Sequence, residues 1–215
     1  MRALAYYAVR DLIPLYAVYA LLFADHGLST GEISSLFVIW SVTTFVAEIP
    51  SGAWADTVPR RLLLALSPPL YAAGFATWIV APGYAGFAAG FVMWAISGAL
   101  MSGTYEAYLY DELAELGASA SYPRLFGFAN SAAMVCNLAA TFAAAPLMAV
   151  GGYALVGWVS VVVALLQFVV ALTLPPATRI ARRPEAGGIV RRYVGTLLSG
   201  FREGHRASVP CVTAP

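Results

Sequence analysis

The chain has 215 residues, of which 60% are hydrophobic and 11% are charged. Soluble domains carry roughly 25% charged residues, so this composition excludes an ordinary soluble domain and indicates a membrane protein. The twelve basic residues are all arginine and nearly balance eleven acidic ones for a formal charge of +1, which predicts no nucleic-acid partner.

Six apolar stretches are each long enough to cross a bilayer as a helix, which takes about 20 residues. They cover residues 4–24, 33–55, 62–81, 84–110, 125–150 and 153–174. Arg10 and Asp11 interrupt the first, and no small-residue cleavage site precedes Asp25, so we interpret this stretch as a retained helix and not a signal peptide. The stretches are apolar all round, which disfavours membrane strands. The predicted fold class is therefore an all-α membrane protein with six transmembrane helices in residues 1–175.

The arginines predict the orientation, because short cytoplasmic loops are enriched in basic residues. The second and fourth connections hold Arg60, Arg61 and Arg124, whereas the first, third and fifth hold none. Every other arginine lies near the start or in the tail. We therefore expect a multi-pass protein of the cell (inner) membrane with both termini in the cytoplasm.

The tail, residues 176–215, is rich in arginine. Between about residues 188 and 203 its apolar side chains recur with helical spacing opposite arginines. This pattern predicts an amphipathic helix on the cytoplasmic membrane surface.

Three acidic residues fall inside the predicted spans: Asp11, Glu48 and Glu106. A charge at the bilayer centre costs about 2.5 to 3.5 kcal/mol on insertion scales, so each needs a reason. Facing the bundle interior, these carboxyls could take up and release protons during transport. Alternatively, they pair with Arg10 or backbone donors and only lock the helices, or Arg10 and Asp11 sit at the headgroup level. Being adjacent, those two fall on different helix faces and need not pair.

Several features favour a solute cavity within the bundle. Pro14 removes a backbone hydrogen bond from the first helix and predicts a bend there. Tyr16, Trp40 and Trp94 lie near mid-span and are the candidate cavity residues for an organic solute. Aromatic residues nearer helix ends are equally well explained as interfacial anchors.

Enzyme chemistry has little support in the sequence. It contains no Ser-His-Asp arrangement, zinc motif or nucleotide loop, and both histidines, His26 and His205, lie outside the spans. Two cysteines, Cys136 and Cys211, imply neither a disulfide framework nor a metal cluster. We expect no catalytic residues, no metal and no cofactor.

The turn between the second and third helices, residues 52–61, reads G-A-W-A-D-T-V-P-R-R. It resembles the cytoplasmic signature of the major facilitator superfamily (MFS), G-x-L-A-D-R-x-G-R-K. Gly52, Ala55, Asp56 and Arg60 match directly, and Arg61 stands for the lysine. Residues 48–52, E-I-P-S-G, resemble the E-x-P-[ST]-G form of many bacterial members. Residues 102–113 resemble the end of helix four in that group, and Asp11 to Pro14 fits its D-x-x-P start of helix one.

The resemblance implies a secondary transporter in which two six-helix halves rock about a central site. It implies proton-coupled transport, for example efflux, of a small organic solute. Gly52 would allow a close helix approach, and Asp56 with Arg60 would clasp a helix of the other half and favour the outward-facing state. Helix four lacks the arginine of the proton-antiporter pattern, however, and residues 145–152 only loosely echo G-P-x-x-G-G.

Length is the largest departure from the family, whose members usually have twelve spans. The expected partners are the lipid bilayer, a solute, protons, and either a missing C-terminal six-helix half or a second copy of the chain. We therefore interpret the chain as the truncated N-terminal half of an MFS-like transporter. The alternatives are a half-transporter that homodimerises and a non-transporting six-span scaffold.

Overall fold

The computed structural model describes residues 1–175, apart from the side chains of Ile49, Gly52, Ala53, Ala55, Asp56 and Thr57. The amphipathic helix predicted for the tail lies outside the described residues. Within residues 1–175 every regular element is a helix. The elements are α1 (Arg2–Val9), η1 (Pro14–Ala17), α2 (Tyr19–Asp25), α3 (Thr30–Thr57), α4 (Arg60–Val80), α5 (Tyr84–Met101), α6 (Thr104–Glu115), η2 (Ser119–Ser121) and α7 (Tyr122–Leu172).

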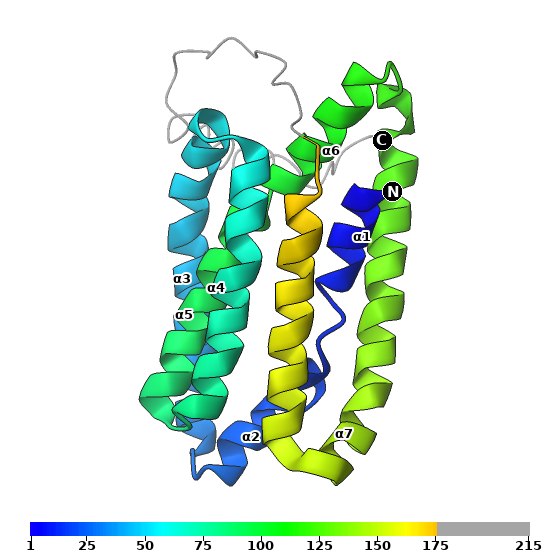
Figure 1. Cartoon of the computed structure of the whole chain (residues 1–215). Helices are drawn as coiled ribbons and strands as arrows, with labels where there is room; N and C mark the ends of the chain where they lie inside the picture. The colour runs from blue at the N-terminus through cyan, green and yellow to red at the C-terminus, as the bar shows by residue number, and fades with distance from the viewer. Residues whose placement is uncertain (176–215) are drawn as a thin grey trace, which may run out of the picture. The chain divides into compact units, whose positions relative to one another are not determined.

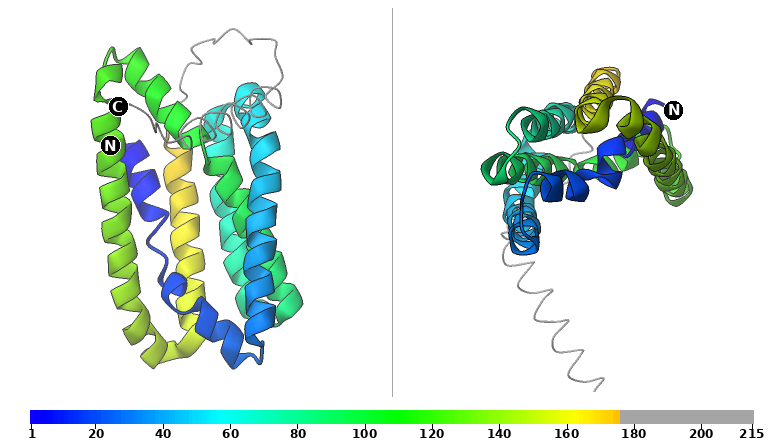
Figure 2. Two further views of the ribbon diagram at one scale, coloured as in Figure 1. Left: turned by 180° about the vertical axis from the view of Figure 1, so that it is seen from behind. Right: turned by 90° about the horizontal axis from the view of Figure 1, so that it is seen from below.

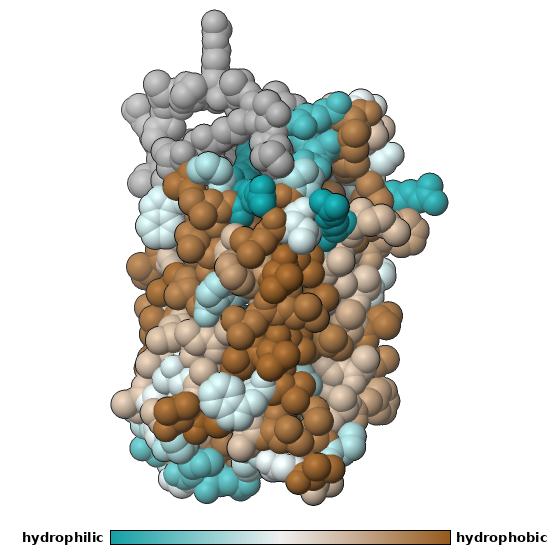
Figure 3. All heavy atoms as spheres, viewed as in Figure 1, coloured by the Kyte–Doolittle hydropathy of each residue, from teal (hydrophilic) through white to brown (hydrophobic). Residues whose placement is uncertain are grey.

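The helices run antiparallel along one bundle (Figure 1). Five stretches are long and apolar enough to cross a membrane: Arg2–Asp25, Thr30–Glu48, Arg60–Val80, Tyr84–Glu115 and Ser119–Leu172. Apolar side chains cover most of the middle of the face shown in Figure 3, and hydrophilic ones gather toward its two ends. This distribution suits a surface whose middle faces lipid.

α7 is folded back on itself at Gly152, where the backbone has φ 60° and ψ −160°. A straight helix of its 51 residues would be about 76 Å long at 1.5 Å per residue, more than twice the roughly 30 Å of a bilayer core. The left-handed φ is one that glycine adopts readily because it lacks a Cβ. Two arms result, residues 122–151 and 153–172, and they run in opposite directions in Figure 1.

α4 packs against both α5 and α7, while α3 packs against α5. The contact of α4 with α5 is close because Gly90 has no side chain: a Cβ there would lie 2.1 Å from the Trp78 indole nitrogen. That nitrogen donates a 3.0 Å hydrogen bond to the Phe87 carbonyl. Deeper along the same interface the Ser67 and Ser97 hydroxyls lie 2.9 Å apart. Small residues and hydrogen-bonded side chains therefore hold α4 and α5 together, as is common between membrane helices.

The first segment, Arg2–Asp25, begins with α1 between the two arms of α7, and its α2 half continues past the second arm toward the start of α3 (Figures 1 and 2). Its α1 half contributes Tyr6 to one hydrophobic cluster, together with Tyr105 and Tyr108 of α6. Its second half contributes Phe23 to another, larger cluster. The residues between these halves are not helical, so the segment is broken where one core ends and the other begins.

Candidate functional site

The break in the first segment follows from Pro14. Proline has no backbone N–H and disfavours helical geometry in the residue before it, and Ile13 is accordingly extended, with φ −112° and ψ 101°. The predicted bend at Pro14 is therefore confirmed in a stronger form, because the helix stops at Val9 and restarts at Pro14.

Side chains of the second α7 arm bind backbone groups that the break releases. The buried Ser160 hydroxyl accepts a 3.1 Å hydrogen bond from the Leu15 N–H. The amide of Gln167, also buried, donates a longer bond of 3.4 Å to the Tyr6 carbonyl. A broken helix inside a membrane needs such partners because lipid offers none. The break is thus a supported feature of the fold.

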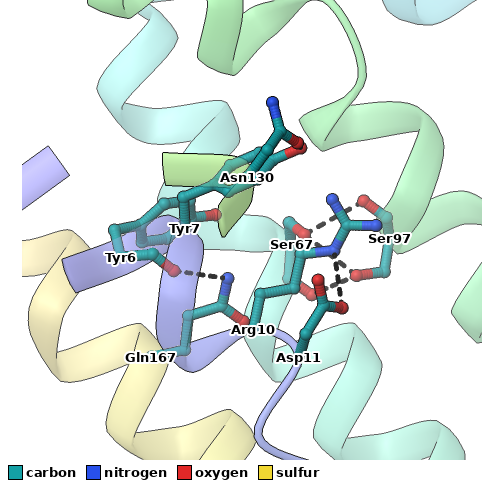
Figure 4. Close-up of polar contacts among 8 residues, drawn as sticks. All are labelled: Tyr6, Tyr7, Arg10, Asp11, Ser67, Ser97, Asn130 and Gln167. Atoms are coloured by element: carbon teal, nitrogen blue, oxygen red, sulfur yellow. Dashed lines mark hydrogen bonds and ion pairs between the residues drawn. The ribbon is translucent and has the colours of Figure 1, made fainter. Parts of the chain in front are cut away.

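Arg10 and Asp11 lie at this break. Their side chains remain 39% and 26% exposed, and the Arg10 Nε lies 3.8 Å from an Asp11 carboxylate oxygen. The expectation that the two need not pair assumed a continuous helix; without one, both turn to the same side and form a long ion pair (Figure 4). Arg10 is eight residues, about 12 Å of helix, further in than Arg2.

Polar groups of the first α7 arm reach the same region. The Tyr7 hydroxyl donates a 3.2 Å hydrogen bond to the Asn130 side chain, and the Tyr7 ring lies 5.7 Å from the Arg10 guanidinium carbon. The break therefore faces both arms of α7, with the residues arranged as in Figure 4.

The three predicted cavity residues come together. The Tyr16 ring stacks on Trp94 with centroids 5.2 Å apart, and Trp40 lies 5.9 Å from the same indole. Tyr71, which the sequence pattern does not single out, joins them at 5.9 Å from Trp94. We call these four residues the aromatic cluster. The Trp40 indole nitrogen and the Tyr71 hydroxyl are buried without a hydrogen-bond partner among the described residues.

Glu48 and Glu106, the other proton-coupling candidates, stand apart from Asp11. Both are exposed on this chain, and neither side chain makes a hydrogen bond or ion pair within the described residues. Glu106 lies in the first turn of α6, where the helix dipole favours a negative charge.

The signature motif lies where α3 ends and α4 begins, and only part of it can be described. Arg60 forms an ion pair with Asp111 of α6 and donates a 2.9 Å hydrogen bond to the Ala107 carbonyl. Arg61 donates to the Leu172 carbonyl at the end of α7. The sequence pattern did not identify Asp111 as the partner of Arg60, although Asp111 lies in residues 102–113, which resemble the end of helix four of the family.

Comparisons with known proteins support the fold and nothing narrower. No family model and no curated protein matches the sequence. Among solved structures, the chain is similar to a POT family transporter, PepTSo, crystallised in meso, with a TM-score of 0.64 at 12% identity. The match covers 93% of this chain and 47% of the other, so the chain spans about half that transporter's length. The chain is therefore a multi-pass membrane protein whose helices are arranged like those of about half of that transporter.

Proposed function

We propose that the chain forms one half of a secondary active transporter that moves a small organic solute by alternating access. The observation that carries this proposal is the broken first segment, which places the partly exposed Arg10 and Asp11 within a stretch long and apolar enough to cross a membrane. Transporters build binding sites from discontinuous helices, whose free ends and irregular backbone line a cavity near the midplane. Charges within a membrane normally face such a cavity.

Six membrane crossings fit this proposal. The two arms of α7 supply the fifth and sixth, since Gly152 reverses the chain between them. The N-terminal ends of α1, α4 and α7 all lie at one end of the bundle (Figure 1), and they carry Arg2, Arg60, Arg61 and Arg124. By the positive-inside rule this end faces the cytoplasm, with both termini, in a cell membrane such as the bacterial inner membrane.

Proton coupling is assigned to Asp11 ahead of the other candidates. It is half-buried, lies at the break and has only a long contact to Arg10. Glu48 and Glu106, by contrast, are exposed on this chain. Glu48 and Glu106 could take part in proton coupling only if a second unit covers them and removes them from their exposed position.

That second unit is part of the proposal, because the chain matches just 47% of the transporter's length. Six further helices or a second copy of the chain would complete the central site. The signature motif, with Gly52, Ala55, Asp56, Arg60 and Arg61, would lie against that unit at the cytoplasmic end and favour one access state. Arg60 and Arg61 would support this contact from within the chain, since they bind α6 and the end of α7.

The competing candidate is a six-span scaffold without transport. A scaffold has no use for a partly exposed arginine and aspartate inside the membrane, where each charge is unfavourable. The two candidates can therefore be told apart through those charges.

The test uses the purified chain in vesicles that contain a pH-sensitive dye, with its oligomeric state measured. Aromatic carboxylates, neutral amides, short peptides and organic amines are added in turn under an imposed pH gradient. At least one class should cause saturable proton movement in the natural protein and little in Asp11→Asn. Glu32→Gln, an exposed capping residue of α3, is the matched control. Proton movement that no solute alters, in vesicles holding an assembled protein, would favour the scaffold.

A further inference from the structure

Most of the hydrogen-bonding capacity of Arg10 is unused. Its contacts are the 3.8 Å approach to Asp11 and the Tyr7 ring at 5.7 Å, and both are too long for hydrogen bonds. The terminal guanidinium nitrogens make no hydrogen bond with the described residues. A guanidinium carries five donors in a planar fork that matches a carboxylate. Arg10 therefore keeps donors available for a ligand that carries an acceptor.

Two more donors without acceptors lie in the aromatic cluster. The Tyr71 hydroxyl belongs to a side chain that is only 4% exposed, and the Trp40 indole nitrogen is also buried; neither has a partner among the described residues. Buried polar groups are nearly always hydrogen-bonded, so each exception calls for an explanation. The indole N–H can only donate. What the region lacks is therefore an acceptor.

Tyr16 connects Arg10 with these donors. It lies in η1, six residues after Arg10 and on the other side of the break. Its ring stacks on Trp94 and lies 6.4 Å from the Tyr71 ring. The cation, the flat aromatic faces and the unused donors thus belong to one region of the bundle, close to the break.

We propose that the solute is an organic anion whose acid group binds the Arg10 guanidinium. Its flat apolar body lies against the rings of the aromatic cluster, and the Tyr71 hydroxyl and the Trp40 N–H donate hydrogen bonds to the same acid group, whose two oxygens offer about four acceptor sites. The assignment rests on the proposed transport function and names the substrate class of the same site. Charge-assisted, bidentate bonds of this kind are about twice as strong as neutral ones. An amine, in contrast, would meet the Arg10 cation and the Trp40 N–H, neither of which can accept its proton, and the Asp11 carboxylate already lies beside the Arg10 cation.

The test compares three probes of nearly equal shape: benzoate, benzamide and benzylammonium. Their binding to the full-length chain in detergent is measured by equilibrium dialysis with radiolabelled probe and by tryptophan fluorescence. Benzoate should bind saturably and at least tenfold more tightly than either of the others.

Variants separate binding from folding. Arg10→Gln should weaken benzoate binding at least tenfold, and Arg10→Lys should restore part of it, since the charge returns without the fork. Tyr71→Phe removes a hydroxyl that has no partner among the described residues, so it should weaken binding several-fold without lowering thermal stability. Arg124→Gln, whose guanidinium lies over the Phe128 ring at the start of α7, is the control and should bind benzoate normally.

The assignment is overturned if benzylammonium or benzamide binds as tightly as benzoate, if none of the probes binds saturably, or if Arg10→Gln leaves benzoate binding unchanged. Failure here is distinguishable from failure of the transport function. A neutral or cationic solute that drives proton movement in vesicles would leave a transporter with a different substrate class. If no class of solute causes proton movement in the natural protein, both the substrate assignment and the transport function are contradicted.

Discussion

The backbone N–H of Leu15 donates a 3.1 Å hydrogen bond to the hydroxyl of Ser160. This bond joins the restart of the first segment to the second arm of α7, 145 residues away. Ser160 is fully buried and its hydroxyl in turn donates to the Val156 carbonyl at 2.8 Å. The break in the first segment is therefore held by a distant element.

Ser160→Ala should lower the free energy of unfolding by about 1–3 kcal/mol, because it leaves the Leu15 N–H unpaired in a buried position. Thermal or denaturant unfolding in detergent measures the change. Ser131→Ala is the control: that serine is exposed and bonds only a carbonyl of its own helix. Equal stability of the two variants would show that the Ser160 bond does not hold the break.

Gly152→Ala should destabilise the reversal of α7 by about 1–3 kcal/mol, because φ 60° with ψ −160° is essentially open only to glycine. Gly127 lies in the same helix and has open space where a Cβ would lie, so Gly127→Ala should be neutral or slightly stabilising. Unfolding measurements on both variants compare them. A Gly152→Ala protein as stable as Gly127→Ala would mean that α7 does not turn at Gly152.

Asp111→Asn should destabilise the protein by about 2–4 kcal/mol, since it leaves Arg60 without its ion-pair partner in a largely buried position. A double-mutant cycle with Arg60→Gln isolates the pair. Glu115→Gln, an exposed acid on the same helix, controls for the loss of a negative charge from α6. A coupling energy near zero would contradict the ion pair.

The orientation can be checked with single cysteines, after replacing Cys136 and Cys211 with serine. Ala81 and Leu116 are exposed and directly follow α4 and α6. The C-terminal ends of these two helices lie at opposite ends of the bundle (Figure 1). A membrane-impermeant maleimide should label Ala81→Cys from outside intact cells and label Leu116→Cys only after the membrane is opened. The reverse pattern would invert the proposed topology.

The sequence predicted the main helices well because apolar length is a strong signal in a membrane protein. The predicted spans at 33–55 and 62–81 correspond to α3 and α4 within a few residues. The span at 84–110 was predicted as one helix and is in fact two, because Gly103 adopts φ 67° between α5 and α6. A flexible glycine inside an apolar run carries no sequence signal strong enough to place such a break.

The site was harder to predict, because it depends on distances between segments far apart in the chain. Pro14 indicated a bend. Tyr16, Trp40 and Trp94, singled out by their mid-span position, do lie together, and their role as cavity residues stays a prediction. The roles of Ser160 and Gln167 could not be read from sequence, since each binds a backbone group more than 100 residues away. The sequence also could not show that the Tyr71 hydroxyl lacks a hydrogen-bond partner among the described residues, because this depends on how the helices pack.

The most direct test of the account compares two kinds of solute movement in vesicles that contain the Asp11→Asn protein. One is exchange of labelled for unlabelled solute across the membrane without a proton gradient, and the other is accumulation driven by a gradient. The account predicts that the variant retains exchange and loses gradient-driven accumulation, while Glu32→Gln retains both. Accumulation at the natural level in Asp11→Asn would contradict proton coupling through the break in the first segment.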